Sequence, residues 1–464
     1  MMLLKKTAIY LFTVMTVSVV SFSCSTEDPT APTTTDDSVI DPADDDPDPD
    51  PDPEPADFVV TFGGSLEDSF SDILRATDGN YVLVGATKSM DGDIVDKETT
   101  DFDYWVLKVT PEGEKIWSKT YGGSGDDKAA SISPTTDGGY IVSGYTSSND
   151  GDVTGNGGFH DYWVVKLDVE GTLQWEQSFG FSGSDQAFQV IQTSDGGYFA
   201  TGYLDVSASG GQGNDDRSGT RHGVGEFWGI RMDASGAFLW RRYFGGTNND
   251  RSYDVVQTSD GGFLMMGASE SDDFDITDSK GSYDYWAVRI TESGDLLWTK
   301  SFGGSGIDVS YAIVPTSEGN YIAVGDARSN DGDVGNPKGN ADVWIISFDD
   351  SGTLLWEKSL GGSQFETARS IAPAESGTFV IGGSTRSNDG DVSSKNGEND
   401  VWMITIDAAG NLLRQASAGG SSLDLGNGIL YDNGMILVGS TESSDLDISE
   451  NKGGIDGLLV KRIN

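Results

Sequence analysis

Cysteine and histidine are scarce in this chain, which contains one cysteine and two histidines among 464 residues. A single cysteine excludes an intramolecular disulfide, and so few imidazoles leave little scope for zinc sites or Cys–His catalysis. Basic residues are also few, since 29 Lys and Arg stand against 75 Asp and Glu, for a net charge of −46. Such a charge disfavours nucleic acid, anionic lipid and acidic glycans as partners.

Long apolar runs are absent apart from one stretch near the N-terminus. Lys5 and Lys6 precede residues 7–20, which are too few for a comfortable membrane span. The stretch ends in Ser21-Phe22-Ser23-Cys24, and small residues before a lone cysteine resemble a bacterial lipoprotein signal. The resemblance implies a signal peptide over 1–23 and lipidation of Cys24. The alternative is an ordinary signal peptide with an incidental cysteine.

Residues 24–57 predict an extended spacer behind this anchor. Thirteen acids and no base lie between Ser25 and Asp57, among many Pro and Thr residues. Such a segment cannot bury a core and repels itself into an extended chain. Glu27 and Asp28 resemble the surface-export signals of Bacteroidota lipoproteins. We therefore expect a lipid anchor in the outer membrane with the protein at the cell surface, the periplasmic face being the alternative.

All eleven tryptophans occupy two positions of a motif that recurs about every 58 residues. Because tryptophan buries more surface than any other side chain, this register indicates one structural unit repeated along the chain. Six tryptophans follow an acidic residue by two places: Trp105, Trp163, Trp228, Trp286, Trp344 and Trp402. Five lie four residues after a turn glycine: Trp117, Trp175, Trp240, Trp298 and Trp356.

The repeated unit predicts four short antiparallel strands. In the second unit, period-two alternation marks segments near 130–132, 140–146, 161–167 and 173–179, with Gly-containing turns. Helical periodicity is absent. Seven such units predict an all-β fold, a seven-bladed β-propeller of four-stranded antiparallel blades over residues 58–464.

The two ends of 58–464 are complementary. Residues 457–462 form a third strand with no fourth after it, and 58–62 form a fourth strand with no preceding three. The N-terminal strand is therefore expected to pair into the last blade and close the ring, removing exposed edges. The rival architecture is an open β-solenoid, which needs caps and gives no reason for complementary incomplete ends.

The unit also resembles a bacterial β-propeller repeat family whose copies read approximately Y-L-G-G-S-G-x-D-x-A, then G-N-x-Y-V-x-G-x-T-x-S-x-D-F-P, then D-x-F-V-x-K-L. Matching text runs here from Tyr121 to Ala129, from Gly139 to Asp150 and from Asp161 to Leu167, and comparable stretches cover nearly all of 58–464. Tryptophan in the strands and D-G-D-[VI] in the loop depart from that pattern. The resemblance implies fold and an extracytoplasmic setting, and no catalytic residue comes with it.

Acidic residues recur at three fixed places of the unit, all expected on one face of the propeller, which should therefore be strongly electronegative. The link between blades carries Asp68, Asp127, Asp185, Asp250, Asp308, Glu366 and Asp424. The loop between the second and third strands carries an S-x-D-x-D pair in six units: Asp91 and Asp93, Asp150 and Asp152, Asp273 and Asp275, Asp331 and Asp333, Asp389 and Asp391, and Asp445 and Asp447. The same loop ends in Asp103, Asp161, Glu226, Asp284, Asp342, Asp400 and Asp456.

Two explanations of these acids stay open. Ser and Asp side chains bond nearby backbone N–H groups in tight connections, and acids repeated in every blade favour this turn chemistry. The alternative is Ca²⁺ held by the loop pairs together with the aspartates that end the loops, because hard cations take carboxylate oxygens from flexible loops. No cofactor is required by the sequence, and Ca²⁺ is the one candidate ion.

The third unit breaks the repeat with a loop seven residues longer that lacks S-x-D-x-D. It brings Arg217, Arg221 and His222 onto the acidic face, and binding residues concentrate on loops that depart from a regular scaffold. We interpret these three residues as a candidate contact for a ligand or partner. A tolerated surface insertion is the alternative.

No catalytic motif such as G-x-S-x-G, H-E-x-x-H or a P-loop occurs in the sequence. We expect a non-catalytic, monomeric envelope lipoprotein whose propeller binds an extracellular protein or glycan through its acidic face. Aromatic residues in the loops are few (Phe159, Phe274 and Tyr283), so stacking on sugar rings is only weakly indicated. The alternatives are an enzyme acting on extracellular polysaccharide and a purely structural spacer.

Overall fold

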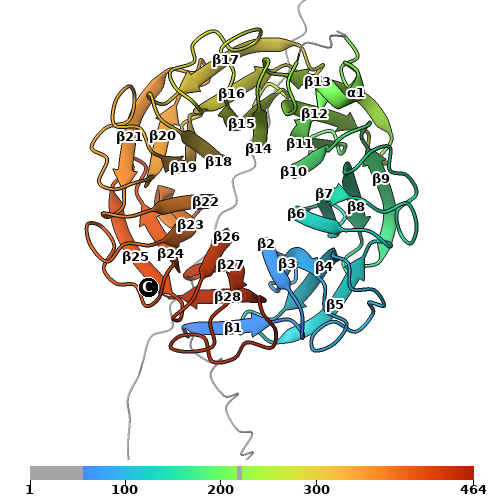
Figure 1. Cartoon of the computed structure of the whole chain (residues 1–464), viewed down its shortest axis with the longest axis vertical. Helices are drawn as coiled ribbons and strands as arrows, with labels where there is room; N and C mark the ends of the chain where they lie inside the picture. Colours follow the sequence, from blue (N-terminus) through green and yellow to red (C-terminus); the bar gives the residue numbers. More distant parts are fainter. Residues whose placement is uncertain (1–55, 217–221, 464) are drawn as a thin grey trace, which may run out of the picture. The chain divides into compact units, whose positions relative to one another are not determined.

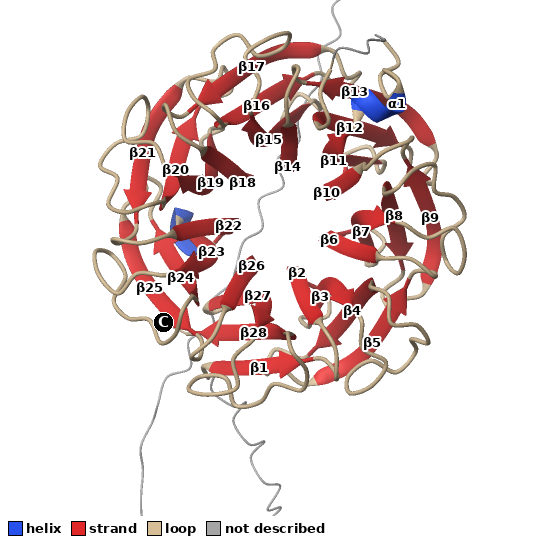
Figure 2. Cartoon of the chain, in the orientation of Figure 1, coloured by secondary structure: helices blue, strands red, loops and turns tan. Residues whose placement is uncertain are grey.

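The computed structural model describes residues 56–216 and 222–463, which form seven four-stranded antiparallel sheets set around a centre (Figure 1). Strands make up nearly all of the regular structure, as Figure 2 shows. The predicted all-β, seven-bladed β-propeller is therefore confirmed. The predicted signal peptide, Cys24 and residues up to 55 lie outside the described residues.

Each of the first six blades runs from an inner to an outer strand in chain order. Blade 1 has β2 (Asp68–Arg75), β3 (Tyr81–Thr87), β4 (Asp103–Val109) and β5 (Lys115–Tyr121). Blade 2 has β6 (Asp127–Pro134), β7 (Tyr140–Thr146), β8 (Asp161–Leu167) and β9 (Leu173–Phe179). Blade 3 has β10 (Gln186–Gln192), β11 (Tyr198–Leu204), β12 (Glu226–Met232) and β13 (Phe238–Phe244).

Blade 4 has β14 (Asp250–Gln257), β15 (Phe263–Ser269), β16 (Asp284–Ile290) and β17 (Leu296–Phe302). Blade 5 has β18 (Asp308–Pro315), β19 (Tyr321–Ala327), β20 (Asp342–Phe348) and β21 (Leu354–Leu360). Blade 6 has β22 (Glu366–Pro373), β23 (Phe379–Thr385), β24 (Asp400–Ile406) and β25 (Leu412–Ala418). The inner strands lie nearest the centre of the ring in Figure 1.

The seventh sheet contains strands from both ends of the described chain. Its inner strands are β26 (Asp424–Tyr431), β27 (Met435–Thr441) and β28 (Asp456–Arg462), and its outer strand is β1 (Phe58–Phe62). The pairing of β1 with β28 is antiparallel and runs from Phe58 opposite Lys461 to Phe62 opposite Gly457. Figure 1 shows β1 lying beside β28.

The core lies between blades, and the first set of tryptophans forms much of it. All six are at most 2% exposed. At three of the joints, the contacts between adjacent blades, a tyrosine hydroxyl of one blade donates to the carbonyl oxygen of the next blade's tryptophan. Tyr104 Oη, for example, donates to Trp163 O at 2.9 Å. These bonds satisfy buried polar groups while the rings fill the joint.

The second set of tryptophans packs each outer strand against the following blade. The ring of Trp175 lies against Gly236, in the turn between β12 and β13, where an added Cβ would come within 2.8 Å of the indole. Trp117, Trp240, Trp298 and Trp356 meet the equivalent glycines. Phe58 takes the same place against Gly113, so β1 contributes the packing that a tryptophan supplies elsewhere.

Helix is confined to a few residues of the described chain. One turn, α1 (Val206–Ser209), lies in the long third loop, and the 3₁₀ turn Glu375–Gly377 joins β22 to β23. Among the described residues, no helix combines the length and apolar character that a membrane crossing requires.

Candidate functional site

The inner strand of every blade contains a β-bulge at the same place. In β2, the register shifts between Phe70 and Asp72, so Ser71 has no partner in β3. A bulge leaves one residue outside the ladder and re-aims its side chain. The seven bulge residues, one from each blade, are Ser71, Ala130, Phe188, Tyr253, Tyr311, Arg369 and Asn427.

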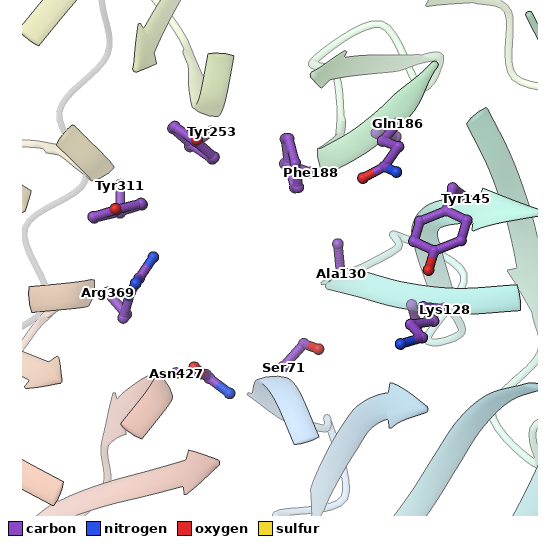
Figure 3. A pocket seen from close by; sticks show the side chains of 12 residues that line it. Ser71, Lys128, Ala130, Tyr145, Gln186, Phe188, Tyr253, Tyr311, Arg369 and Asn427 are labelled. Atoms are coloured by element: carbon purple, nitrogen blue, oxygen red, sulfur yellow. The ribbon is translucent and has the colours of Figure 1, made fainter. Parts of the chain in front are cut away.

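These bulge residues surround one end of the central channel. Figure 3 shows their side chains around a shared opening, together with Lys128, Tyr145 and Gln186. The same residues line a cavity of about 320 Å³, which we call the channel mouth. Lys128 follows the link acid Asp127 directly at the start of β6, so the channel mouth opens on the face that carries the links and long loops. We call that face the loop face.

The channel mouth is the place where the seven blades differ. Six residue types occupy the seven equivalent bulge positions, although the flanking strand pairs keep the same register. Seven identical positions would offer the same contact seven times, whereas seven different ones make a single asymmetric site around the channel.

Aromatic rings form a continuous arc on one side of the channel mouth. The ring centroids of Phe188 and Tyr253 are 5.0 Å apart, and those of Tyr253 and Tyr311 are also 5.0 Å apart. Tyr203 extends the arc behind Phe188 at 5.9 Å. Burial raises the pKa of Tyr311 to about 12, so its hydroxyl stays protonated at neutral pH.

Three cations extend the arc, and each of them contacts an aromatic ring. The guanidinium carbon of Arg369 lies 3.9 Å from the centroid of the Tyr311 ring, a cation–π contact. Lys128 Nζ lies 3.6 Å from the centroid of Phe102, and the carbon of Arg251 lies 4.8 Å from that of Tyr203. Burial lowers the pKa of Lys128.

Two carboxyl groups lie in the channel wall directly after bulge residues. Burial raises the pKa of Asp72 to about 7 and that of Asp254 to about 6. Asp72 accepts N–H bonds from Ile73 and from Ile132 of the next blade, at 2.8 and 3.0 Å. Asp254 accepts equivalent bonds from Val255 and Ile313. Both side chains therefore join adjacent inner strands, and neither lines the channel mouth.

The link acids predicted to make the loop face electronegative are buried. All seven are at most 1% exposed. Asp127 shows their environment: it accepts hydrogen bonds from Gly123 N at 2.9 Å, from Ser147 N at 3.2 Å, from Ser148 Oγ at 2.7 Å and from Thr146 Oγ1. Burial raises the pKa of Asp127, and raises that of Asp185 to about 8. The link acids therefore serve the connections between loops and do not present their carboxylates on the loop face, and the electronegative character of that face stays a prediction.

The S-x-D-x-D pairs join each long loop to the link that precedes its blade. In the first blade, Asp91 accepts from Ser65 N at 2.7 Å and Asp93 accepts from Gly63 N at 3.1 Å. Repeated bonds of this kind are the turn chemistry predicted as one explanation of these acids. The same two bonds recur in the five other pairs, Asp150 and Asp152, Asp273 and Asp275, Asp331 and Asp333, Asp389 and Asp391, and Asp445 and Asp447.

The acids that end the long loops are also buried, and each faces a link acid. A Cβ added to Gly122 would lie 2.6 Å from an oxygen of Asp103 and 2.6 Å from an oxygen of Asp127, so only glycine fits between them. Asp161, Asp284, Asp342, Asp400 and Asp456 occupy the same place in later blades. Burial raises the pKa of Asp103 to about 6, and Asp161, Asp284 and Asp456 behave alike.

Lysine side chains contact several of the aspartates that were predicted as calcium ligands. Lys452 Nζ lies 2.6 Å from Asp93 of the next blade, Lys280 contacts Asp333, and Lys338 contacts Asp391. Asp103, Asp150 and Asp152 line one open pocket, but Lys97 lies there too, 2.7 Å from Asp103.

Within residues 56–216 and 222–463, no group of three or more His, Cys, Asp or Glu side chains is arranged to hold a metal. The structure therefore does not gather the aspartates predicted as calcium ligands into ligand sets. Asp275 and Asp447 show the reason, because their carboxylates accept backbone N–H bonds from link glycines, from Gly245 at 3.1 Å and from Gly419 at 3.4 Å. Calcium binding stays a prediction from the sequence, and calorimetric titration of metal-free protein with Ca²⁺ tests it.

Of the three residues predicted as a contact in the long third loop, only His222 is among the described residues. Arg217 and Arg221 lie outside them. His222 is 9% exposed, and its ring stacks on Phe274 at 4.8 Å while Nδ1 lies 3.3 Å from Glu226. The ring therefore packs against Phe274 of the next blade's long loop, and a ligand contact at the third loop stays a prediction.

Sequence reasoning missed the channel mouth, although a signal for it exists. Every bulge residue lies three places after the link acid of its unit, as Tyr253 does after Asp250. The acids stand out in the sequence because they recur in every unit. The bulge residues do not stand out because they differ from unit to unit.

No protein-family model matches the chain. The regulatory protein FlaEY of Caulobacter vibrioides is 28% identical over 133 residues, which are 26% of this chain and 14% of that protein, so the match spans a small part of its length. Among solved structures, the WD40 domain of Neurospora crassa Pan2 gives a TM-score of 0.47 at 9% identity, covering 89% of this chain and 97% of that one. Sqt1 of Chaetomium thermophilum gives 0.42 at 9% identity, covering 83% and 82%.

Proposed function

We propose that this protein is a non-catalytic glycan-binding module that takes its ligand at the channel mouth. The observation that carries the proposal is the bulge ring, in which one side chain from every blade converges on one cavity and the residue types differ from blade to blade. A cavity of about 320 Å³ falls at the lower end of the range for small-molecule sites. It suits one or two sugar rings of a longer chain.

The side chains at the channel mouth match the chemistry of a sugar. The faces of Phe188, Tyr253 and Tyr311 offer apolar surfaces on which the C–H face of a pyranose stacks. Ser71, Gln186 and Asn427 supply hydroxyl and amide groups for hydrogen bonds to sugar hydroxyls. A stacking arc beside polar groups gives orientation as well as affinity, which a purely structural spacer does not need.

The cellular setting belongs to the same proposal. An anchor at Cys24 and an acidic spacer over 24–57 would hold the propeller away from the outer membrane at the cell surface, where extracellular glycans are met. The periplasmic face is the alternative location, and selective labelling of intact cells distinguishes the two.

A glycan array probed with the full chain carrying Cys24→Ala, which prevents lipidation, tests the binding function. We expect a defined set of glycans to bind, and Tyr311→Ala to abolish that binding. Glu318→Ala is the matched control, because Glu318 is exposed in the turn between β18 and β19, at the other end of the same blade. Captured glycans are expected to be recovered unchanged by mass spectrometry. Binding that survives Tyr311→Ala would contradict a site at the channel mouth.

A further inference from the structure

The cavities at the channel end on the loop face contain bases and no acids. A second cavity, of about 240 Å³, shares Tyr253 and Tyr311 with the channel mouth and is also lined by Arg251 and Arg328. Together with Lys128 and Arg369 of the first cavity, the two contain four cationic side chains and no carboxyl group. In a chain with 75 acids and 29 bases, such a lining is opposite in sign to the whole protein.

Three of these four cations make no ion pair with the described residues, and the fourth, Arg328, reaches Asp326 only at 3.9 Å. In the part of the chain that the structure describes, Lys128, Arg251 and Arg369 have no carboxylate oxygen within 4.0 Å. Other cations on strands form ion pairs: Arg231 lies 2.6 Å from Asp195, and Lys108 lies 2.7 Å from Asp78. The contrast marks the channel mouth as a place where positive charge is kept available.

Aromatic contacts hold these cations in place without using their hydrogen-bond donors. A guanidinium stacked on a ring, as Arg369 is on Tyr311, keeps its N–H groups at the edge of the plane. An anion that approaches from the cavity can then receive two parallel hydrogen bonds, the geometry that a carboxylate fits. Asp326 interacts electrostatically with Arg369, but it is 2% exposed, contacts Arg328 at 3.9 Å, accepts a bond from Thr367 and lines neither cavity.

We infer that the glycan bound at the channel mouth is an acidic saccharide whose carboxylate is received by Arg369 while its ring stacks on Tyr311 and Tyr253. The inference rests on the proposed function, that the channel mouth binds a glycan, and adds the chemical class of the sugar. It reverses the expectation from net charge that acidic glycans are disfavoured. A charge of −46 describes the whole chain, whereas binding depends on the field inside one cavity.

Matched pairs of probes test the inference. The full chain carrying Cys24→Ala is titrated with oligosaccharides of galacturonate, glucuronate, mannuronate and guluronate, and with the methyl ester of each. We expect at least one acid form to bind tenfold or more tightly than its ester, and the preference to weaken as salt concentration rises. Arg369→Gln should remove the preference by weakening binding of the acid form tenfold or more relative to the ester, whereas Tyr311→Ala should abolish binding of both forms.

The outcomes separate this inference from the proposed function. Equal binding of acid and ester, or an acid preference that Arg369→Gln does not alter, overturns the acidic saccharide and leaves glycan binding standing. If neutral glycans of the array bind and no acid oligosaccharide does, the acidic saccharide is likewise overturned and glycan binding still stands. If no glycan binds, both the acidic saccharide and the proposed glycan-binding function are overturned. Both are also overturned if poly-glutamate competes as strongly as the best acid oligosaccharide. Circular dichroism of each variant shows whether it is folded.

Discussion

Arg369 and Tyr311 occupy the same position in neighbouring blades, and the guanidinium carbon of Arg369 lies 3.9 Å from the centroid of the tyrosine ring. Both are bulge residues, so their side chains contact each other across the blade joint without taking part in the strand ladders. The residues that line the cavity are therefore different from those that hold the blades together. Changes at these positions should alter what the channel mouth binds before they alter the fold.

The first prediction concerns this separation. Arg369 is exposed and lies outside the β22–β23 ladder, so Arg369→Ala should change the free energy of unfolding by no more than about 0.5 kcal/mol. Urea unfolding followed by tryptophan fluorescence measures this. A loss of several kcal/mol would show that the residue supports the joint rather than the site.

A link acid should behave in the opposite way. Asp127→Ala removes the acceptor of four hydrogen bonds that join a link, the end of β7 and a long loop, so we expect a loss of about 3 kcal/mol. Asp272→Ala is the control, because Asp272 is exposed and makes no side-chain hydrogen bond among the described residues. Equal midpoints for the two variants in urea would refute a structural role for the link acids.

The packing of tryptophan on glycine gives a matched pair of substitutions in one blade. Gly236 and Gly196 both have positive φ, of 80° and 89°, but only Gly236 lies against an indole. Gly196→Ala should cost about 1 kcal/mol from backbone strain alone. Gly236→Ala should cost a further 1–3 kcal/mol, roughly, because its Cβ overlaps Trp175. Calorimetric melting temperatures rank the two, and similar values would mean that the indole moves aside freely.

Stability should decrease as the pH rises above 5. Burial raises the pKa of Asp185 from 3.8 to about 8 and that of Asp72 to about 7. A carboxyl whose pKa is higher in the folded protein than in the unfolded chain keeps its proton on folding. Its stabilising contribution is therefore present below pH 4 and is lost as the pH rises through the folded value. We expect a decrease on the order of 2 kcal/mol or more between pH 5 and 8.

The acid side of the same profile has the opposite sign. Asp137, Asp195 and Asp260 have their pKa lowered to about 2, with hydrogen bonds from nearby threonines and contacts with Lys166, Arg231 and Arg289. Their contribution is lost as the pH falls from about 4 toward 2. Melting temperatures measured from pH 3 to pH 8 should therefore peak near pH 4–5. A peak at pH 7 or above would contradict burial of protonated acids between the blades.

The fold could be predicted from the sequence because its largest side chains and its turns repeat in register. Trp163 and Trp175 lie at fixed distances from glycine turns, so one unit predicts the next. The burial of the link acids could not be predicted in this way. A carboxylate such as Asp250 is polar in sequence, and only the folded loop brings Gly246 N and the hydroxyls of Ser269 and Ser271 to it.

The channel mouth escaped prediction for a related reason. Phe188, Tyr253 and Tyr311 are about 60 residues apart in sequence, and each looks like one more apolar residue of an inner strand. Only the bulge turns them from the sheet into the channel, and a bulge has no distinct mark in period-two alternation. The cations of the two cavities were not predicted as a site because the net charge of the chain is a sum that also counts the many buried acids.

The seventh sheet cannot be completed until both ends of residues 58–462 have been made, since Phe58 in β1 pairs with Lys461 in β28. A chain that ends between β25 and β28 keeps six complete sheets, and β1 is then left without its partner strand. Unpaired edges recruit other strands, and proteases and chaperones act on such surfaces. A complete seventh sheet therefore requires that both β1 and β28 be present, so this sheet depends on the two strands that are farthest apart in the described chain.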